Sequence, residues 1–305
     1  MKKIFSVAKS KGINKHWCGT CNALRKNDKL SIEPMKVEIF NGEIKEFYDN
    51  GRILAEWKCK RGKYIGLSKL YYPNGKLREV QSYRNGKLEG LSRAYFDNGK
   101  IQFEIMRRAG KLNGITKEYY SNGNLESEGP YKDGRKQGFF KYYHSNGNLM
   151  EEGHYDGPSG AGLYKWYNRK GVLVEDRYYK NGKSNGPCRE YYDNGNLWKK
   201  YSYTQGKISE GLYLVFRKNG LVWHRDNYKN DKKEGAFATF APNGCLESVR
   251  IYHKEKRTGS LSKKEIRDLL AKESSKTPIQ TRRALAKKYK INPAEFKEVL
   301  NYNKK

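Results

Sequence analysis

The chain has 305 residues, 36% of them hydrophobic, and a formal net charge of +30. Its mean hydropathy of −1.01 is too low for one large globular core, whereas 25 tyrosines and 11 phenylalanines are too many for a disordered chain. These numbers favour a thin core that is repeated along the chain. The positive charge is spread over the whole length and is densest in residues 260–305, which favours acidic or polyanionic partners.

Residues 1–41 precede any repeat and form a predicted N-terminal extension. Their first residues, "MKKIFSVAKSKG", carry the lysines of a signal peptide but an apolar run of only about five residues, where a secretory signal needs roughly 7–15. No stretch approaches the roughly 18 apolar residues of a membrane span. We therefore expect a soluble cytoplasmic protein, and we do not expect a membrane partner because no amphipathic apolar anchor accompanies the charge.

The extension contains one motif with metal or redox chemistry, "HWCGTC" at residues 16–21. His16, Cys18 and Cys21 would form half of a zinc site and would have to recruit Cys59, because the sequence has no second Cys-x-x-Cys. A thioredoxin-like interpretation lacks the preceding strand and the βαβ context. We expect plain thiols, with no metal and no cofactor, and zinc is the alternative.

Residues 42–259 repeat with a step of 24 residues, interrupted by one step of 25. Such a fixed period is the mark of a repeat architecture. Two columns of glycine show it. The first column is Gly42, Gly66, Gly90, Gly114, Gly138, Gly162, Gly186, Gly211, Gly235 and Gly259, and the second is Gly51, Gly75, Gly99, Gly123, Gly147, Gly171, Gly195, Gly220 and Gly244.

Numbered from the first glycine of each repeat, position +5 is aromatic, +11 is aliphatic, +17 is mostly tyrosine and +1 is mostly apolar. All four columns are odd-numbered, and a period of two predicts strands with one buried face. A three-residue loop, a type I turn closed by a left-handed glycine, pairs +5 with +11 and +3 with +13, as in Lys69–Glu79 and Lys165–Glu175. A second turn at "RNGK" (84–87) or "KNGK" (180–183) returns the chain to the next repeat.

Each repeat is therefore predicted to be one β-hairpin. The predicted fold is mainly β: an elongated single-sheet solenoid of nine 24-residue hairpin repeats, with a small α-helical C-terminal module.

The repeats resemble the MORN family, in particular its bacterial variant repeat, and "EYYSNGNLESEGPYKDGRKQG" (118–138) carries the resemblance most fully. The resemblance implies a non-catalytic binding surface, and bacterial members are described as antitoxin or immunity-like components. Four residues of the later repeats depart from the pattern. Arg217 and Ala241 replace the second aromatic residue, and Asp231 and Glu255 replace the return-turn glycine, so we expect these last repeats to be terminal caps.

Two columns are candidate partner-binding residues. Position +3 is basic and includes Lys69, Arg93, Lys117, Lys141 and Lys165; position +6 is aromatic and includes Tyr48, Tyr72, Phe96, Tyr120 and Tyr192. We expect the even-numbered +6 rings to be less buried, and rows of exposed rings suit protein hot spots and base stacking. The alternative for the +3 column is a solvated charged ladder.

Residues 260–305 lose the glycines and gain helix formers. "SLSKKEIRDLL" (260–270) predicts a capped helix with Ile266, Leu269 and Leu270 on one face. Residues 277–305 predict two helices, and Arg282 to Leu300 resemble a helix-turn-helix in which Lys290 stands where the family has glycine. The resemblance implies nucleic-acid contacts from Arg282, Arg283, Lys287, Lys288, Asn292 and Lys297. The alternative is a helical cap or protein-docking module.

No arrangement of the five histidines, and no Ser/His/Asp or phosphate-loop pattern, predicts catalysis. We expect a non-enzymatic scaffold that binds a protein partner, an acidic protein or a toxin being the candidates, in the manner of an antitoxin or immunity-like protein. The alternative is a nucleic-acid-binding protein that uses residues 260–305, with the repeats as spacer or oligomerisation surface.

Overall fold

The computed structural model describes residues 25–26, 29–30, 41–156, 160–209, 211–270 and 277–292. His16, Cys18, Cys21 and Lys297 lie outside these residues, so the predictions made for them are not addressed by it. The chain divides into two compact units, Met1–Gly147 and Asn148–Lys305, and each is described by itself.

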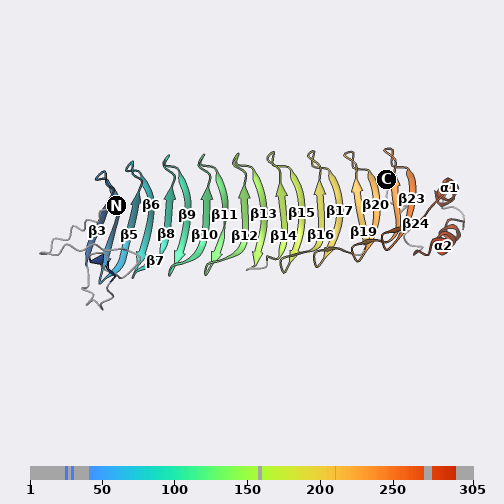
Figure 1. Ribbon diagram of the computed structural model, residues 1–305. Helices are drawn as coiled ribbons and strands as arrows, with labels where there is room; N and C mark the ends of the chain where they lie inside the picture. The colour runs from blue at the N-terminus through green and yellow to red at the C-terminus, as the bar shows by residue number, and fades with distance from the viewer. Residues whose placement is uncertain are drawn as a thin grey trace. The chain divides into compact units, whose positions relative to one another are not determined.

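The first unit is an antiparallel sheet in which strands pair with their neighbours in the chain, apart from a separate two-residue pair formed by β1 (Arg25–Lys26) and β2 (Lys29–Leu30). Figure 1 shows these strands side by side in chain order. The sheet strands are β3 (Gly42–Phe47), β4 (Ile53–Lys60), β5 (Lys63–Tyr71), β6 (Leu77–Arg84), β7 (Lys87–Leu88), β8 (Gly90–Tyr95), β9 (Ile101–Arg108), β10 (Lys111–Tyr119), β11 (Leu125–Lys132) and β12 (Arg135–Tyr143).

The second unit repeats this arrangement and adds two short helices. Its strands are β13 (Leu149–Asp156), β14 (Gly162–Tyr167), β15 (Leu173–Lys180), β16 (Lys183–Tyr191), β17 (Leu197–Thr204), β18 (Lys207–Ile208), β19 (Gly211–Phe216), β20 (Val222–Lys229), β21 (Lys232–Lys233), β22 (Gly235–Phe240), β23 (Leu246–His253) and β24 (Lys256–Ser260). The helices are α1 (Lys263–Leu270) and α2 (Thr277–Tyr289). The predicted fold class, hairpin repeats in an antiparallel sheet with a small helical C-terminal module, is confirmed.

The Asn-Gly phrase makes the predicted three-residue turn. The Gly75 amide donates to the Tyr72 carbonyl and the Tyr72 amide donates to the Lys76 carbonyl, both at 2.8 Å. Gly75 has φ +85°, a left-handed conformation that glycine adopts without steric cost. Pro73 occupies the first central position, and Tyr71 pairs with Leu77 as expected.

The return turn is a two-residue type I′ turn. Arg84 pairs with Lys87, and Asn85 and Gly86 have φ values of 52° and 80°, as this turn requires. Asp231 and Glu255, which replace the glycine, also adopt positive φ, at 65° and 74°. The departures from the repeat pattern therefore keep the shape of the turn.

The cross-strand register beyond the turn differs from the predicted one by one residue. Lys69 lies opposite Val80 and Lys165 opposite Asp176, so the predicted pairs Lys69–Glu79 and Lys165–Glu175 are wrong. The cause is a β-bulge after the turn, between +4 and +5, which leaves the +12 residue unpaired. Position +3 consequently faces +14 instead of +13.

The bulge also changes which columns share a face. Positions +1, +3, +5, +14 and +16 lie on one face, named here the ladder face, and positions +2, +4, +13, +15 and +17 lie on the other, named the packed face. The +5 and +17 columns are therefore on opposite faces. The expectation that all odd columns are buried together is wrong, and Leu67 and Ile115 of the +1 column are 55% and 52% exposed.

The helices cover the last strands of the second unit. Leu285 and Ala286 of α2 and Ile266 and Leu269 of α1 share one buried cluster with the sheet, which includes Val249. The other cluster members are Leu214, Val222, Ala236, Ala238, Phe240, Ile251 and Leu261. Among the described residues the helical module is thus a cap on the sheet, although Leu270, predicted on its buried face, is 51% exposed.

The predicted serine cap of α1 is present. The Glu265 amide donates to Ser262 Oγ at 3.2 Å and the Ser262 amide donates to Glu265 Oε2 at 2.7 Å, which is a reciprocal capping box. α2 ends at Tyr289. The next residue, Lys290, has a φ of +54°, the left-handed conformation that glycine commonly adopts after a helix. In the described part of the chain, neither helix has the length and hydropathy needed to cross a membrane.

Candidate binding surfaces

The +3 and +14 columns form a ladder of ion pairs and hydrogen bonds along the ladder face. In the first unit, Lys69 Nζ lies 3.1 Å from Glu56 Oε1, and the Tyr71 hydroxyl donates to the same oxygen at 2.7 Å. Glu56 belongs to the repeat before Lys69 and Tyr71, so one carboxylate links two hairpins. The same contacts are made by Tyr119 to Glu104 (3.1 Å) and Tyr143 to Glu128 (3.0 Å), and in the second unit by Tyr167 to Glu152 (2.9 Å) and Tyr191 to Asp176 (2.8 Å).

These contacts shift the pKa values of both partners. The hydrogen bond from Tyr71 and the contact with Lys69 hold the pKa of Glu56 below its ordinary value. Burial and the bond to Glu56 raise the pKa of Tyr71 to about 12, and those of Tyr167 and Tyr191 rise to about 12 for the same reasons. Glu56 is therefore charged at neutral pH, and Tyr71, Tyr167 and Tyr191 are neutral.

The ladder determines what the predicted +3 column presents to solvent. Arg93 Nε lies 2.7 Å from Glu104, Lys117 Nζ lies 3.9 Å from Glu128, and Lys165 Nζ lies 3.1 Å from Glu152. Lys141 lies opposite Glu128 in the β11–β12 pairing. These cations have carboxylate neighbours, so the +3 column is a charge-balanced ladder more than a basic track.

The +6 aromatic residues are half-buried and connect repeats through their hydroxyl groups. The hydroxyl of Tyr72 donates to the Tyr95 carbonyl and that of Tyr120 to the Tyr143 carbonyl, both at 2.7 Å. Tyr192 makes the same bond to Phe216 at 2.7 Å in the second unit. Phe96 occupies the same position without a hydroxyl. The column thus has a structural role that the sequence alone did not indicate.

The packed face is filled by aromatic rings. Tyr64 contacts Tyr83 with ring centroids 5.4 Å apart, and Tyr131 contacts Phe140 at 5.5 Å. In the second unit Tyr164 lies between Tyr155 and Tyr179, at 5.3 Å from each. Ring contacts therefore fill this face in both units, whereas the buried cluster under α1 and α2 lies on the ladder face of the second unit.

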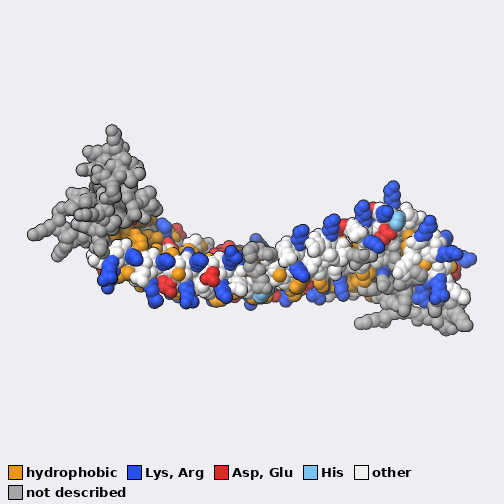
Figure 2. Space-filling model, turned by 90° about the horizontal axis from the view of Figure 1, so that it is seen from below, with side chains coloured by type: hydrophobic (Ala, Val, Ile, Leu, Met, Phe, Trp, Pro, Cys, Tyr) orange, Lys and Arg blue, Asp and Glu red, His pale blue; other side chains and the backbone are white. Residues whose placement is uncertain are grey.

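A row of exposed apolar side chains lies on the ladder face of the first unit. They come from the +1 column and the +16 position opposite it, where Leu91 pairs with Met106 and Ile115 with Pro130. We name this row the apolar row; it consists of Leu67 (55% exposed), Leu91 (37%), Met106 (40%), Ile115 (52%) and Phe139 (47%). Figure 2 shows hydrophobic side chains among charged ones along the face in view. The sequence indicated that +1 is apolar, but only the bulge explains why it is exposed.

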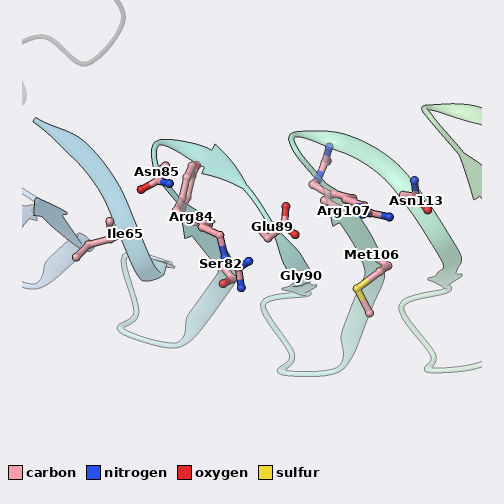
Figure 3. Close-up of a pocket in the computed structure, with 11 residues that line it drawn as sticks. Ile65, Ser82, Arg84, Asn85, Glu89, Gly90, Met106, Arg107 and Asn113 are labelled. Atoms are coloured by element: carbon pink, nitrogen blue, oxygen red, sulfur yellow. The ribbon is translucent and has the colours of Figure 1, made fainter.

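Two shallow hollows lie between successive return turns of the first unit. One is lined by Tyr83, Arg84, Met106, Arg107 and Arg108 among others, with the Met106 thioether and the Arg84 and Arg107 side chains around it in Figure 3. The other is lined by Lys87, Arg108, Lys111, Tyr131 and Lys132 among others. Both have several cationic residues and one tyrosine among their lining residues.

The described part of the helix-turn-helix candidate presents few free cations. Arg283 and Lys287 are exposed and Arg282 is half-buried. Lys288 Nζ lies 2.7 Å from Glu265 Oε1 on α1. Burial opposes the shift, but the bonds from Lys288 and Ser262 lower the pKa of Glu265 to about 2. Asn292 is exposed.

The described residues contain no cluster of three or more metal-ligating side chains. Cys59, which a zinc site would have to recruit, is a buried free thiol on the packed face, and burial raises its pKa. Metals prefer the thiolate form, so this environment does not favour Cys59 as a ligand.

Six segments of the chain match the sequence profile of the MORN repeat variant: residues 64–85, 88–107, 112–133, 136–156, 162–181 and 184–205. These six segments are MORN variant repeats. The remaining hairpins, β3–β4, β19–β20 and β22–β23, have the same turn geometry as the matched MORN repeats.

The chain matches no curated protein. Among solved structures it is similar to a chain of the TcdB2–TccC3 crystal structure, with 13% identity, a TM-score of 0.20 and coverage of 73% of this chain. It is also similar to a chain of the Photorhabdus luminescens Tc holotoxin pore, with 14% identity, a TM-score of 0.20 and coverage of 72%. This chain spans 14% of the length of either one.

Proposed function

We propose that the MORN repeats are a non-enzymatic scaffold that binds a protein partner through the apolar row of the first unit. The row is the observation that carries the proposal. Large apolar side chains gathered on one surface and exposed by 37–55% are uncommon on monomeric soluble proteins unless the surface binds something.

The second unit supports this role, because its ladder face is covered by helices where the residues on that face are apolar. There Ala236 at +1, Val249 at +14 and Ile251 at +16 are buried under α1 and α2. In the first unit the corresponding columns hold the apolar row, which the described residues leave exposed. A partner with an amphipathic helix suits this row.

The ladder beside the row gives the site its polar rim. Lys69, Arg93 and Lys117 retain substantial exposure, at 41–45% of their side chains, while they contact carboxylates. A partner with acidic residues flanking its apolar stripe would complement both rows, because charges at the rim of an interface guide association.

The finer proposal, drawn from the MORN resemblance, is an antitoxin or immunity-like role in the cytoplasm in which the partner is a toxin. Nucleic-acid binding by residues 260–305 is the alternative, and exposed Arg283 and Lys287 on α2 favour it.

Affinity capture with matched variants tests the proposal. Leu91→Glu/Ile115→Glu places charges in the apolar row, and Ser121→Glu/Ser145→Glu places the same charges at exposed Asn-Gly turns. We expect wild type and the turn variant to retain the same protein partner from the source cells and the row variant to lose it, with all three equally folded by circular dichroism. Equal capture by the row variant would refute the assignment.

A further inference from the structure

A second surface of the first unit carries a repeated charge pattern that the ladder does not explain. Positions +18 and +21, which flank the return turn, lie directly opposite each other and are both basic. Like charges at directly opposed positions destabilise a hairpin, so their recurrence in every return turn of the first unit has a cost. The pairs are Lys60–Lys63, Arg84–Lys87, Arg108–Lys111 and Lys132–Arg135. We name these eight residues the basic edge.

All eight side chains are exposed. Within the described part of the first unit, none of them lies in an ion pair with a carboxylate, in contrast to the ladder. The nearby Glu89 is occupied otherwise, since its Oε2 accepts from the Ala109 amide of the next return turn at 2.8 Å. The basic edge is therefore a line of uncompensated charge.

The two hollows lie along this edge. Arg108 lines both, together with Arg84 in one and with Lys87, Lys111 and Lys132 in the other. Each also has an apolar wall, formed by Ile65, Tyr83 and Met106 or by Pro130 and Tyr131. Successive basic pairs are two strands apart, which is about 10 Å. Cations thus alternate with recesses whose lining residues include Tyr83 or Tyr131.

We propose that the basic edge of the first unit binds single-stranded nucleic acid, with phosphates on the basic pairs and bases at the hollows. A positively charged track combined with aromatic contacts for bases is the general chemistry of single-strand recognition. A duplex would offer the phosphates but keep its bases stacked inside. The site shares Met106 with the apolar row and includes no residue of α2.

The structure favours this ligand over two other polyanions. A membrane surface would be expected to receive apolar side chains, yet the turn tips are Arg61-Gly62, Asn85-Gly86, Ala109-Gly110 and Asp133-Gly134. An acidic protein would be expected to meet an apolar anchor between the charges, whereas the described pairs of the basic edge have hollows between them.

The test uses the full chain and fluorescence anisotropy with single-stranded oligonucleotides over a salt series. The edge variant is Arg84→Gln/Lys87→Gln/Arg108→Gln/Lys111→Gln. The control, Arg52→Gln/Lys76→Gln/Arg78→Gln/Lys100→Gln, removes the same charge near the Asn-Gly turns of the same unit, where all four residues are exposed. We expect the edge variant to lose affinity by more than about tenfold and to lower the salt slope by about 3, as for four single-strand phosphate contacts, and the control to lose less than half as much.

Three further probes examine the ligand class: an abasic oligonucleotide of equal length, a duplex, and vesicles or polyglutamate of matched charge. We expect each of them to bind at least about tenfold more weakly than the single strand, because stacking contributes measurably per base. Equal losses in the edge and control variants, an unchanged edge variant, or equal binding of any of these probes would overturn the proposal. The first two results would be obtained if residues 260–305, and not the basic edge, bound the nucleic acid.

Discussion

The hydroxyl of Tyr48 donates a hydrogen bond to the backbone carbonyl of Tyr71, at 2.6 Å and 23 residues further along the chain. Tyr72 and Tyr120 repeat the bond to Tyr95 and Tyr143. Where arginine replaces the aromatic residue, the Arg217 guanidinium donates to the Phe240 carbonyl at 2.8 Å. These +6 residues thus share a donor that reaches the next hairpin, and the tyrosine ring is one way to place it.

Removing this donor should weaken the contact between two hairpins. We expect Tyr120→Phe to lower the free energy of unfolding by about 1 kcal/mol, the usual net contribution of one such bond. Phe96→Tyr is the matched opposite change, and we expect it to raise stability by a similar or smaller amount because it supplies the missing hydroxyl. Urea unfolding of the full chain measures both. No change in either variant would mean that the bond contributes nothing.

A second relationship couples neighbouring repeats on the packed face. A Cβ added at Gly129 would lie 2.1 Å from Phe140, and Phe140 is only 3% exposed. Gly129 has no positive φ, so its role is to leave space for the ring. We expect Gly129→Ala to cost about 1–3 kcal/mol, the usual range for overpacking a core.

A double-mutant cycle isolates that effect. Ser92 occupies the position of Phe140 two repeats earlier, so Phe140→Ser imitates a residue that the repeat accepts. We expect Gly129→Ala to cost much less in the Phe140→Ser background than alone, which gives a coupling energy of at least about 1 kcal/mol. Strictly additive costs would show that the ring and the glycine do not act together.

The turn residues could be predicted from the sequence because their chemistry is local. Asn-Gly requires left-handed φ, and Pro73 fits only one central position, so loop length and the Tyr71–Leu77 pair followed directly. The exposure of the apolar row could not, because a single bulge reverses the face of every later residue in the hairpin and so places the +17 rings on the face opposite the +1 column. The contacts of Lys69 and Tyr71 with Glu56 were also missed, because Glu56 belongs to the preceding repeat and the prediction paired residues only within one hairpin.

The ladder predicts acid sensitivity of the first unit. The hydrogen bond from Arg93 is the largest influence that lowers the pKa of Glu104, with Tyr119 assisting against burial. A lowered pKa stabilises the folded state above the unfolded value of 4.5, and this stabilisation is lost as the pH falls through the folded pKa. We expect Glu104→Gln to lower stability at pH 7 and to have little effect near pH 3.

Unfolding in urea at both pH values checks this expectation. Glu126→Gln, which removes a carboxylate at +12 outside the ladder, is the control and should show a smaller loss of stability at pH 7 than Glu104→Gln. A cost for Glu104→Gln that is equal at the two pH values would show that the residue acts by packing instead of charge.

Asp226 predicts the opposite pH dependence in the second unit. Burial opposite Tyr213 on the packed face raises its pKa from 3.8 to about 6, despite Lys233, Arg250 and Arg225. A carboxyl whose folded pKa is raised favours folding only while protonated, so stability should fall as the pH rises from about 4 to about 6 and stay level above. At about 1.4 kcal/mol per pKa unit, the loss is at most about 3 kcal/mol.

Asp226→Asn should remove this pH dependence. The stability of the variant minus that of wild type should therefore be more favourable at pH 8 than at pH 4. Asp193→Asn, at an exposed turn, is the control and should follow wild type. Urea titrations followed by tryptophan fluorescence between pH 4 and pH 8 measure the difference, and parallel curves for wild type and Asp226→Asn would show that Asp226 titrates as it does in the unfolded chain.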